Sequence, residues 1–119
     1  MEAEMTTEGS ALKMTRYACR KDNTQAEVEA ALQAAGWETY DYSRVGFGVP
    51  DVIARRAGFK LWVEVKSPGD GLTRSEMRFH AICPGDVIVA TTGAGAVELA
   101  EMAYRHYQNS IKDFYGVKE

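Results

Sequence analysis

A chain of 119 residues, 45% hydrophobic and 26% charged, is long enough for one globular domain of ordinary size. No apolar run approaches the ~20 residues of a membrane-spanning helix, and the acidic first ten residues resemble neither a secretory signal nor a transit peptide. The net charge of −3 weighs against bulk electrostatic binding of nucleic acid, although the chain beyond those ten residues is balanced in charge. Cys19 and Cys83 lack metal-ligand spacing, so we expect reduced thiols and a cytoplasmic protein.

The first 20 residues lack hydrophobic periodicity and are expected to form a flexible or partly ordered segment ahead of a single domain over residues 21–119. Residues 25–35 are rich in strong helix formers with apolar side chains at helical spacing, and they predict a helix that ends at Gly36. Residue 23 or 24 would cap this helix, and Glu27 has capping-box spacing from Thr24.

The next part of the chain predicts three strands. Residues 37–43 alternate between large and polar side chains, as a strand does, and a glycine-containing loop follows over residues 44–49. Residues 51–55 and 59–66 predict the two strands of a hairpin. A loop over residues 67–71 then leads to a helix that Thr73 and Glu76 cap and Pro84 ends.

The chain closes with a short apolar strand over residues 87–90 and a helix over about residues 96–114. This order predicts an α/β fold in which a central mixed four-stranded sheet is flanked by the N-terminal and later helices. Its first three strands form an antiparallel meander and a crossover helix leads into the fourth. The last helix carries apolar side chains at spacings of three and four: Val97, Ala100, Tyr104, Tyr107, Ile111 and Phe114. A core-facing stripe is the favoured interpretation, and a dimer contact is the alternative.

The hairpin brings polar residues together. If Ala57 and Gly58 form a two-residue loop, Asp51 lies directly opposite Glu64, with Cβ atoms roughly 4.5–5.5 Å apart on one face of the sheet. Lys66 lies two residues beyond Glu64 and shares that face. A three-residue loop would shift the register by one and separate the two acids.

Two carboxylates held this close repel each other unless a proton or a cation lies between them. Oxygen ligands of this kind suit Mg²⁺, with Mn²⁺ as a substitute, and the Val65 backbone carbonyl is placed to serve as a third ligand. Lys66 is close enough to orient or deprotonate an attacking water, or to stabilise charge on a phosphate. The residues therefore predict an acidic metal site beside a lysine.

The order of these motifs resembles the PD-(D/E)XK nuclease superfamily. Gly48-Val49-Pro50-Asp51 and Glu64-Val65-Lys66 are similar to its two signature motifs. Residues from about 20 to 97 more narrowly resemble the small stand-alone VRR-NUC-type nucleases of phages and their hosts, which share an acid-bearing first helix and a later helix of the form Leu72-Thr73-Arg74-Ser75-Glu76 with Phe79-His80. Each motif is short and weak evidence by itself. The order and spacing of all the motifs together are much more specific to the family.

The resemblance implies a restriction-endonuclease-like core and a metal-dependent DNA endonuclease, a hydrolase of phosphodiester bonds that acts on structured or branched DNA in the manner of a Holliday-junction resolvase. Asp51 and Glu64 would hold the metal and Lys66 would act on the attacking water. Glu27 matches the further acid of the family's first helix, with Glu29 as a less favoured substitute. The family often has glutamine where this chain has Glu76. If the chain is phage-encoded, its site of action is the cytoplasm of a bacterial host.

Basic residues around the site are candidates for phosphate contacts: Arg74, Arg78, Arg44, Arg55, Arg56 and Lys60. Arg74 and Arg78 lie four residues apart at the start of one helix and are the first choice. A homodimer that presents two sites would suit four-way junction cleavage. The alternatives are a non-catalytic DNA-binding or assembly module on the same fold, a flap, repair-type or restriction-like nuclease, and an enzyme acting on a small phosphate ester.

Overall fold

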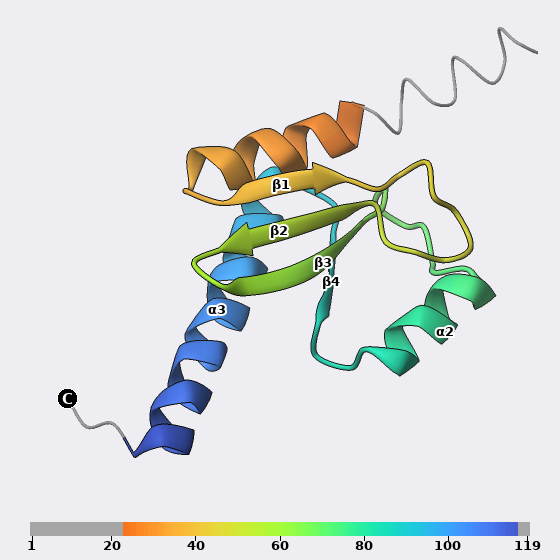
Figure 1. The fold of residues 1–119 in the computed structure, drawn as a ribbon. Helices are drawn as coiled ribbons and strands as arrows, with labels where there is room; N and C mark the ends of the chain where they lie inside the picture. The colour runs from red at the N-terminus through yellow and green to blue at the C-terminus, as the bar shows by residue number, and fades with distance from the viewer. Residues whose placement is uncertain (1–22, 117–119) are drawn as a thin grey trace, which may run out of the picture.

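The structure, a computed structural model, describes residues 23–116, so the predicted N-terminal segment over residues 1–20 lies outside the described residues. An N-terminal helix covers residues 23–34. The elements that follow are β1 (Glu38–Asp41), β2 (Val52–Arg56), β3 (Phe59–Val65), α2 (Arg74–Ile82), β4 (Val87–Ala90) and α3 (Gly93–Tyr115) (Figure 1). Within residues 23–116, no helix combines the length and apolar character needed to cross a bilayer.

The strands form one four-stranded sheet in the order β1-β2-β3-β4. The first three strands pair antiparallel, and β4 pairs parallel with β3 after the crossover through α2. This topology confirms the predicted α/β class and the mixed sheet. It also places the end of β3 next to the start of β2, where the motif residues lie.

The hairpin has the predicted register. Val52 pairs with Val63 and Arg56 with Phe59, which leaves Ala57 and Gly58 as a two-residue loop. Both loop residues have positive φ, 50° and 90°, as a type I′ turn requires. An alanine in this conformation is strained by roughly 1–2 kcal/mol, so strand pairing rather than turn preference sets the register.

The hydrophobic core lies on one face of the sheet, under the N-terminal helix and α3. Val28 and Leu32 of the N-terminal helix are fully buried, and α3 contributes Ala96 and Ala100. The sheet contributes alternate residues of its central strands: Val52, Ala54, Leu61, Val63 and Val65. Because strand side chains alternate, the residues between them, Glu64 among them, face the other side.

The other face is covered more thinly. None of the residues of α2 is fully buried. Trp62 contacts it through Phe79, with ring centroids 5.3 Å apart, and contacts Tyr42 of the loop after β1 at 5.5 Å. The helix and this loop therefore attach to the sheet mainly through one tryptophan and the polar contacts described below.

α3 begins at Gly93, earlier than predicted, because Thr92 accepts a hydrogen bond from Gly95 N–H and caps the helix. Gly93 and Gly95 lie inside the first helical turn, where Gly93 packs closely on the N-terminal helix. A Cβ atom on Gly93 would lie 2.7 Å from the Cβ of Ala31. The helix ends at Gly116, which has a left-handed φ of 69°.

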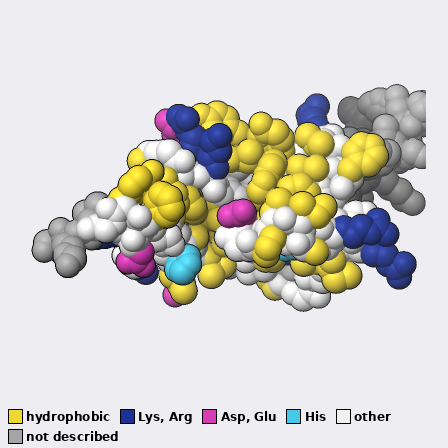
Figure 2. Space-filling view, turned by 60° about the horizontal axis from the view of Figure 1, so that its bottom comes forward, with side chains coloured by type: hydrophobic (Ala, Val, Ile, Leu, Met, Phe, Trp, Pro, Cys, Tyr) yellow, Lys and Arg dark blue, Asp and Glu magenta, His cyan; other side chains and the backbone are white. Residues whose placement is uncertain are grey.

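The apolar stripe of α3 is only partly a core stripe. Ala100 is fully buried and Tyr104 packs on the rings of Trp37 and Phe59. Farther along, Ile111 is 40% and Phe114 81% exposed. Figure 2 shows the face at the bottom of Figure 1, where hydrophobic side chains are exposed in several separate groups.

Arg56 ties the hairpin to α3. Its guanidinium forms a 2.7 Å ion pair with Glu101 and donates a 2.6 Å hydrogen bond to the Ala35 carbonyl. It also stacks over Trp37, 4.3 Å from the ring centroid. Arg56 is therefore a structural residue and not one of the phosphate contacts that we predicted from the sequence.

Candidate functional site

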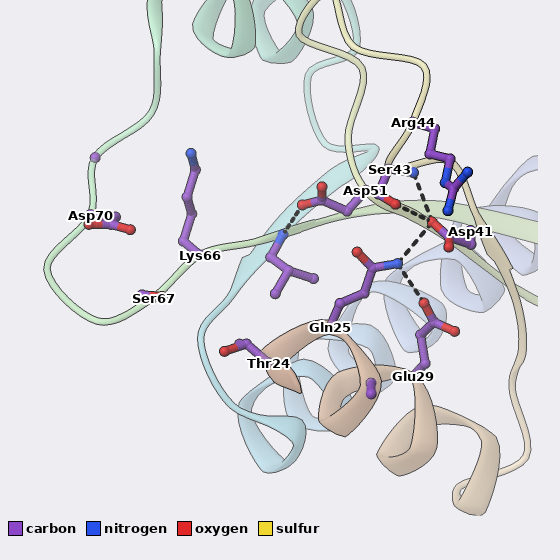
Figure 3. Close-up of a pocket in the computed structure, with 13 residues that line it drawn as sticks. Thr24, Gln25, Glu29, Asp41, Ser43, Arg44, Asp51, Lys66, Ser67 and Asp70 are labelled. Carbon is purple, nitrogen blue, oxygen red and sulfur yellow. Dashed lines mark hydrogen bonds between the residues drawn. The ribbon is translucent and has the colours of Figure 1, made fainter. Parts of the chain in front are cut away.

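A cavity of about 740 Å³ opens at the end of the sheet that carries the motif residues (Figure 3). It lies between the N-terminal helix, the segment after β1 and the loop that follows β3. Asp51, Val65 and Lys66 line it, as does Arg44 from the loop after β1. Most other lining side chains are polar, so the cavity suits a charged, hydrated ligand.

Asp51 and Glu64 lie together, as the register predicted. Asp51 directly precedes β2, and its Oδ2 accepts a 2.9 Å hydrogen bond from the Val65 backbone N–H (Figure 3). Glu64 is only 2% exposed. Its Oε1 is buried and has no hydrogen-bond partner. A buried carboxylate oxygen without a partner is costly in free energy. Glu64 does not itself line the cavity. It lies behind Asp51 and interacts with that carboxylate.

The environment of Glu64 opposes its negative charge. Burial, and then the charges of Asp51 and Glu76, raise the pKa of Glu64 to about 8. Without a cation the side chain therefore holds a proton at neutral pH. A divalent cation would take the place of that proton, because Asp51, Glu64 and the Val65 carbonyl offer the hard oxygen donors that Mg²⁺ prefers.

Lys66 is held by Glu76. Its Nζ lies 2.8 Å from Glu76 Oε1, and the two side chains are only 11% and 17% exposed. Burial alone would lower the pKa of Lys66, but the hydrogen bond and charge of Glu76 outweigh it and raise that pKa. Lys66 is thus kept as an ammonium group at the edge of the cavity.

Glu76 has a second role, which the sequence predicted. Its Oε1 accepts a 2.8 Å hydrogen bond from Thr73 N–H, while its own N–H donates to the Thr73 hydroxyl at 3.2 Å. This capping box fixes the first turn of α2. The same carboxylate therefore starts the helix and holds the lysine.

Glu27 is not part of this group in the structure, in contrast to the sequence-based hypothesis. Its Oε2 accepts a 3.0 Å hydrogen bond from Gly93 N–H and so binds the N-terminus of α3. The N-terminal helix instead presents Gln25 and Glu29 to the cavity. The physical reason is the rotation of the helix about its own axis, which turns Glu27 toward α3.

Gln25 joins the helix to the edge strand. Its amide Nε2 donates to Glu29 at 2.7 Å and to Asp41 at 2.9 Å (Figure 3). Asp41 also accepts from the hydroxyl and N–H of Ser43, at 2.7 and 2.8 Å, and these bonds, followed by that of Gln25, lower its pKa. Glu29, which the sequence predicted as the less favoured substitute for Glu27, lines the cavity. Gln25 was not predicted, because only its i, i+4 spacing from Glu29 hints at a shared face.

The predicted phosphate contacts are dispersed. Arg44 lines the cavity, and Arg74 and Arg78 are exposed on α2. Arg55 is engaged with Glu38 of β1 through an ion pair of 2.6 Å. Lys60 lies beside a separate, smaller cavity near Trp62. Of the predicted set, Arg44 is the residue that lines the same cavity as Asp51, and its charge acts on Asp41.

Among residues 23–116, no group of three or more His, Cys, Asp or Glu side chains is arranged to hold a metal ion. The candidate donor set is smaller, two carboxylates and one backbone carbonyl. Comparison with protein families, curated proteins and solved structures finds no match for the chain. The functional inference therefore depends on the geometry of the site and on the motif resemblance.

Proposed function

We propose that the chain is a Mg²⁺-dependent endonuclease that hydrolyses phosphodiester bonds in structured or branched DNA, on a restriction-endonuclease-like core of the PD-(D/E)XK type. One observation carries the proposal. Glu64 is a fully buried acid with an unpartnered oxygen, it lies against Asp51, and both lie beside a lysine at the edge of a polar cavity. Such a cluster lowers the stability of the fold, and clusters of this kind occur mainly at functional sites.

Asp51, Glu64 and the Val65 carbonyl would hold the metal. A bound Mg²⁺ would supply activation of water at neutral pH and neutralise charge on the phosphate. Lys66 would bring its ammonium group to the phosphate oxygens, because its pairing with Glu76 keeps it protonated and fixes its direction. Glu76 would act through Lys66 as a positioning residue.

The charges in and near the cavity are of both signs, so only part of this surface suits a polyanionic substrate. Arg44 lines it, and Arg74 and Arg78 are exposed on the helix that Glu76 caps. Acids such as Asp41 and Glu29 also line it, so a long duplex would meet repulsion away from the metal. This balance favours substrates that present one strand to the cavity, as flaps and junctions do. Two sites in a homodimer would allow paired nicks on a four-way junction.

The test is a cleavage panel in Mg²⁺, in Mn²⁺ and in EDTA, with single-stranded, duplex, flap, splayed-arm and four-way junction DNA. Wild-type protein should cut at least one substrate with either metal and none in EDTA. Asp51→Asn, Glu64→Gln and Lys66→Ala should each remove cleavage, by roughly 100-fold or more. Asp70→Asn is the matched control, because Asp70 lines the cavity but lies outside the proposed donor set.

The same panel separates the alternatives. DNA binding with no cleavage of any substrate in either metal would favour the non-catalytic module. Cutting confined to flaps would favour a repair-type nuclease, and symmetric nicks on the junction a resolvase. Cleavage by Asp51→Asn or Glu64→Gln at the wild-type rate would refute the assignment of the site.

A further inference from the structure

Phe47 is a fully exposed aromatic side chain in the loop between β1 and β2. It is 94% exposed, and none of the aromatic side chains in the described part of the chain packs on its ring. A single exposed hydrophobic residue is ordinary on a protein surface, but an almost completely exposed phenyl ring on a structured loop is uncommon. Its local backbone shows that this exposure is built into the loop.

The loop holds Phe47 in a tight turn. Val49 N–H donates a 3.0 Å hydrogen bond to the Gly46 carbonyl, which closes a turn with Phe47 and Gly48 at its centre. Both central residues have positive φ, 58° and 81°. For phenylalanine this left-handed conformation costs roughly 1–2 kcal/mol. A glycine would fit position 47 without that cost. A use for the phenyl ring would explain why phenylalanine occupies the position.

The turn is fixed against α2. A Cβ atom on Gly48 would collide with the backbone carbonyl of Ser75, so only glycine allows this approach. The turn therefore lies against the first turn of α2, which also carries Arg74 and Glu76. Phe47 therefore projects into solvent from a turn whose backbone is packed on α2.

The turn is also continuous with the candidate site. Ser43 and Arg44 of the same loop line the cavity, and Asp51 follows Phe47 by four residues. Four extended residues span at most about 14 Å, and the turn shortens this distance. That length corresponds to about four stacked nucleotides at ~3.4 Å each. A strand with a phosphate at Asp51 can therefore reach the ring with one of its next few bases.

We infer that Phe47 is a stacking platform for an unpaired base of the DNA strand whose phosphate enters the cavity. This inference rests on the proposed nuclease function and deepens it. A base in a duplex already has both faces stacked, so Phe47 selects strands with free bases, as in flaps and splayed arms. Stacking of a base on an aromatic side chain contributes about 1–3 kcal/mol and does not depend on which base is present.

The competing occupant is an apolar surface of another protein. Val45 of the same loop is 47% exposed and would add to such a contact. The two occupants differ in what they require of position 47. A base needs a flat π face, whereas an apolar surface needs only buried area, which leucine supplies nearly as well.

The experiment measures binding of the full chain, in a Glu64→Gln background that prevents cleavage, to fluorescent single-stranded and duplex oligonucleotides with Mg²⁺. Phe47→Ala and Phe47→Leu should both weaken single-strand binding by about 5- to 100-fold, and Phe47→Trp should retain it. Duplex binding should change less than about 2-fold. A 2-aminopurine base near the cut site should lose fluorescence on binding wild type but not Phe47→Ala.

Phe114→Ala is the matched control, since Phe114 is 81% exposed on the far part of α3, and it should bind both DNAs as wild type does. Phe47→Gly should match or exceed the thermal midpoint of wild type, since glycine relieves the backbone strain at position 47, while losing single-strand binding. Such a result excludes misfolding as the cause. Wild-type affinity in Phe47→Leu, or equal loss for single strand and duplex, would overturn the platform. If the wild-type chain cleaves DNA and Phe47→Ala cleaves flaps equally well, the inference fails while the nuclease assignment stands. If wild type cleaves none of the five DNA substrates, both fail.

Discussion

The protonation of Glu64 gives a prediction about stability that requires no substrate. In the unfolded chain this glutamate ionises near its ordinary pKa of 4.5, but in the folded protein burial, Asp51 and Glu76 raise the pKa to about 8. Between these values the folded state holds a proton that the unfolded state has lost. The free energy of unfolding therefore falls as pH rises, by up to about 1.4 kcal/mol per pH unit.

Between pH 5 and pH 8 the metal-free protein should lose about 3–4 kcal/mol of stability through Glu64 alone. This is a large part of the total stability of a domain of this size. Glu64→Gln keeps the shape of the side chain and removes its titration, so its stability should not show this fall. The difference between the two proteins reports the titration of Glu64 together with its effect on its acidic neighbours.

Mg²⁺ should reverse the loss in wild type. The cation binds the ionised form of Glu64, so it should stabilise the protein more at pH 8 than at pH 6. The difference should be about 2–3 kcal/mol when Mg²⁺ is at a hundredfold excess over its Kd at pH 8. Urea denaturation of both proteins at pH 5, 6, 7 and 8, with and without Mg²⁺, measures these quantities. Parallel pH curves for wild type and Glu64→Gln in metal-free buffer would refute the reasoning about the buried acid.

Three further predictions concern the framework around the site. Glu27→Ala should lower the free energy of unfolding by about 1 kcal/mol, because it removes the hydrogen-bond acceptor at the start of α3, and it should leave DNA cleavage unchanged. Loss of cleavage without loss of stability would show that Glu27 belongs to the active site. Glu101→Gln should cost about 1 kcal/mol in urea denaturation, since its ion pair joins the hairpin to α3, and an unchanged midpoint would contradict this. Gly48→Ala should cost about 2 kcal/mol or more, because the new methyl group meets the Ser75 carbonyl. Gly46→Ala has a similar positive φ but open space around it and should cost about half as much; equal thermal shifts would show that the contact is unimportant.

The hairpin was predictable from the sequence because its information is local. A two-residue loop fixes which residues face each other, and the position of Leu61 and Val63 between Lys60 and Glu64 indicates the buried face. These two facts place Glu64 beside Asp51 without knowledge of the rest of the fold. The capping box of α2 was equally local, since Thr73 and Glu76 lie within one turn.

The features that escaped prediction depend on packing between distant segments. The apolar stripe of the N-terminal helix has Gln25 on one flank and Glu27 on the other, and only its docking against α3 decides which flank faces the cavity. The ion pair of Lys66 joins a strand to the following helix across a loop, so sequence spacing did not reveal it. The exposure of Phe47 likewise follows from the docking of its loop against α2.

The central claim is that the buried acid pair serves metal-dependent cleavage of DNA. Its most direct test is the cleavage of the five DNA substrates by wild type and by Glu64→Gln, side by side at pH 8 in Mg²⁺. We predict cleavage of at least one flap, splayed-arm or junction substrate by wild type and loss of roughly 100-fold or more in the variant. Equal cleavage by the two proteins, or no cleavage of any substrate by wild type in Mg²⁺ or Mn²⁺, would contradict the claim.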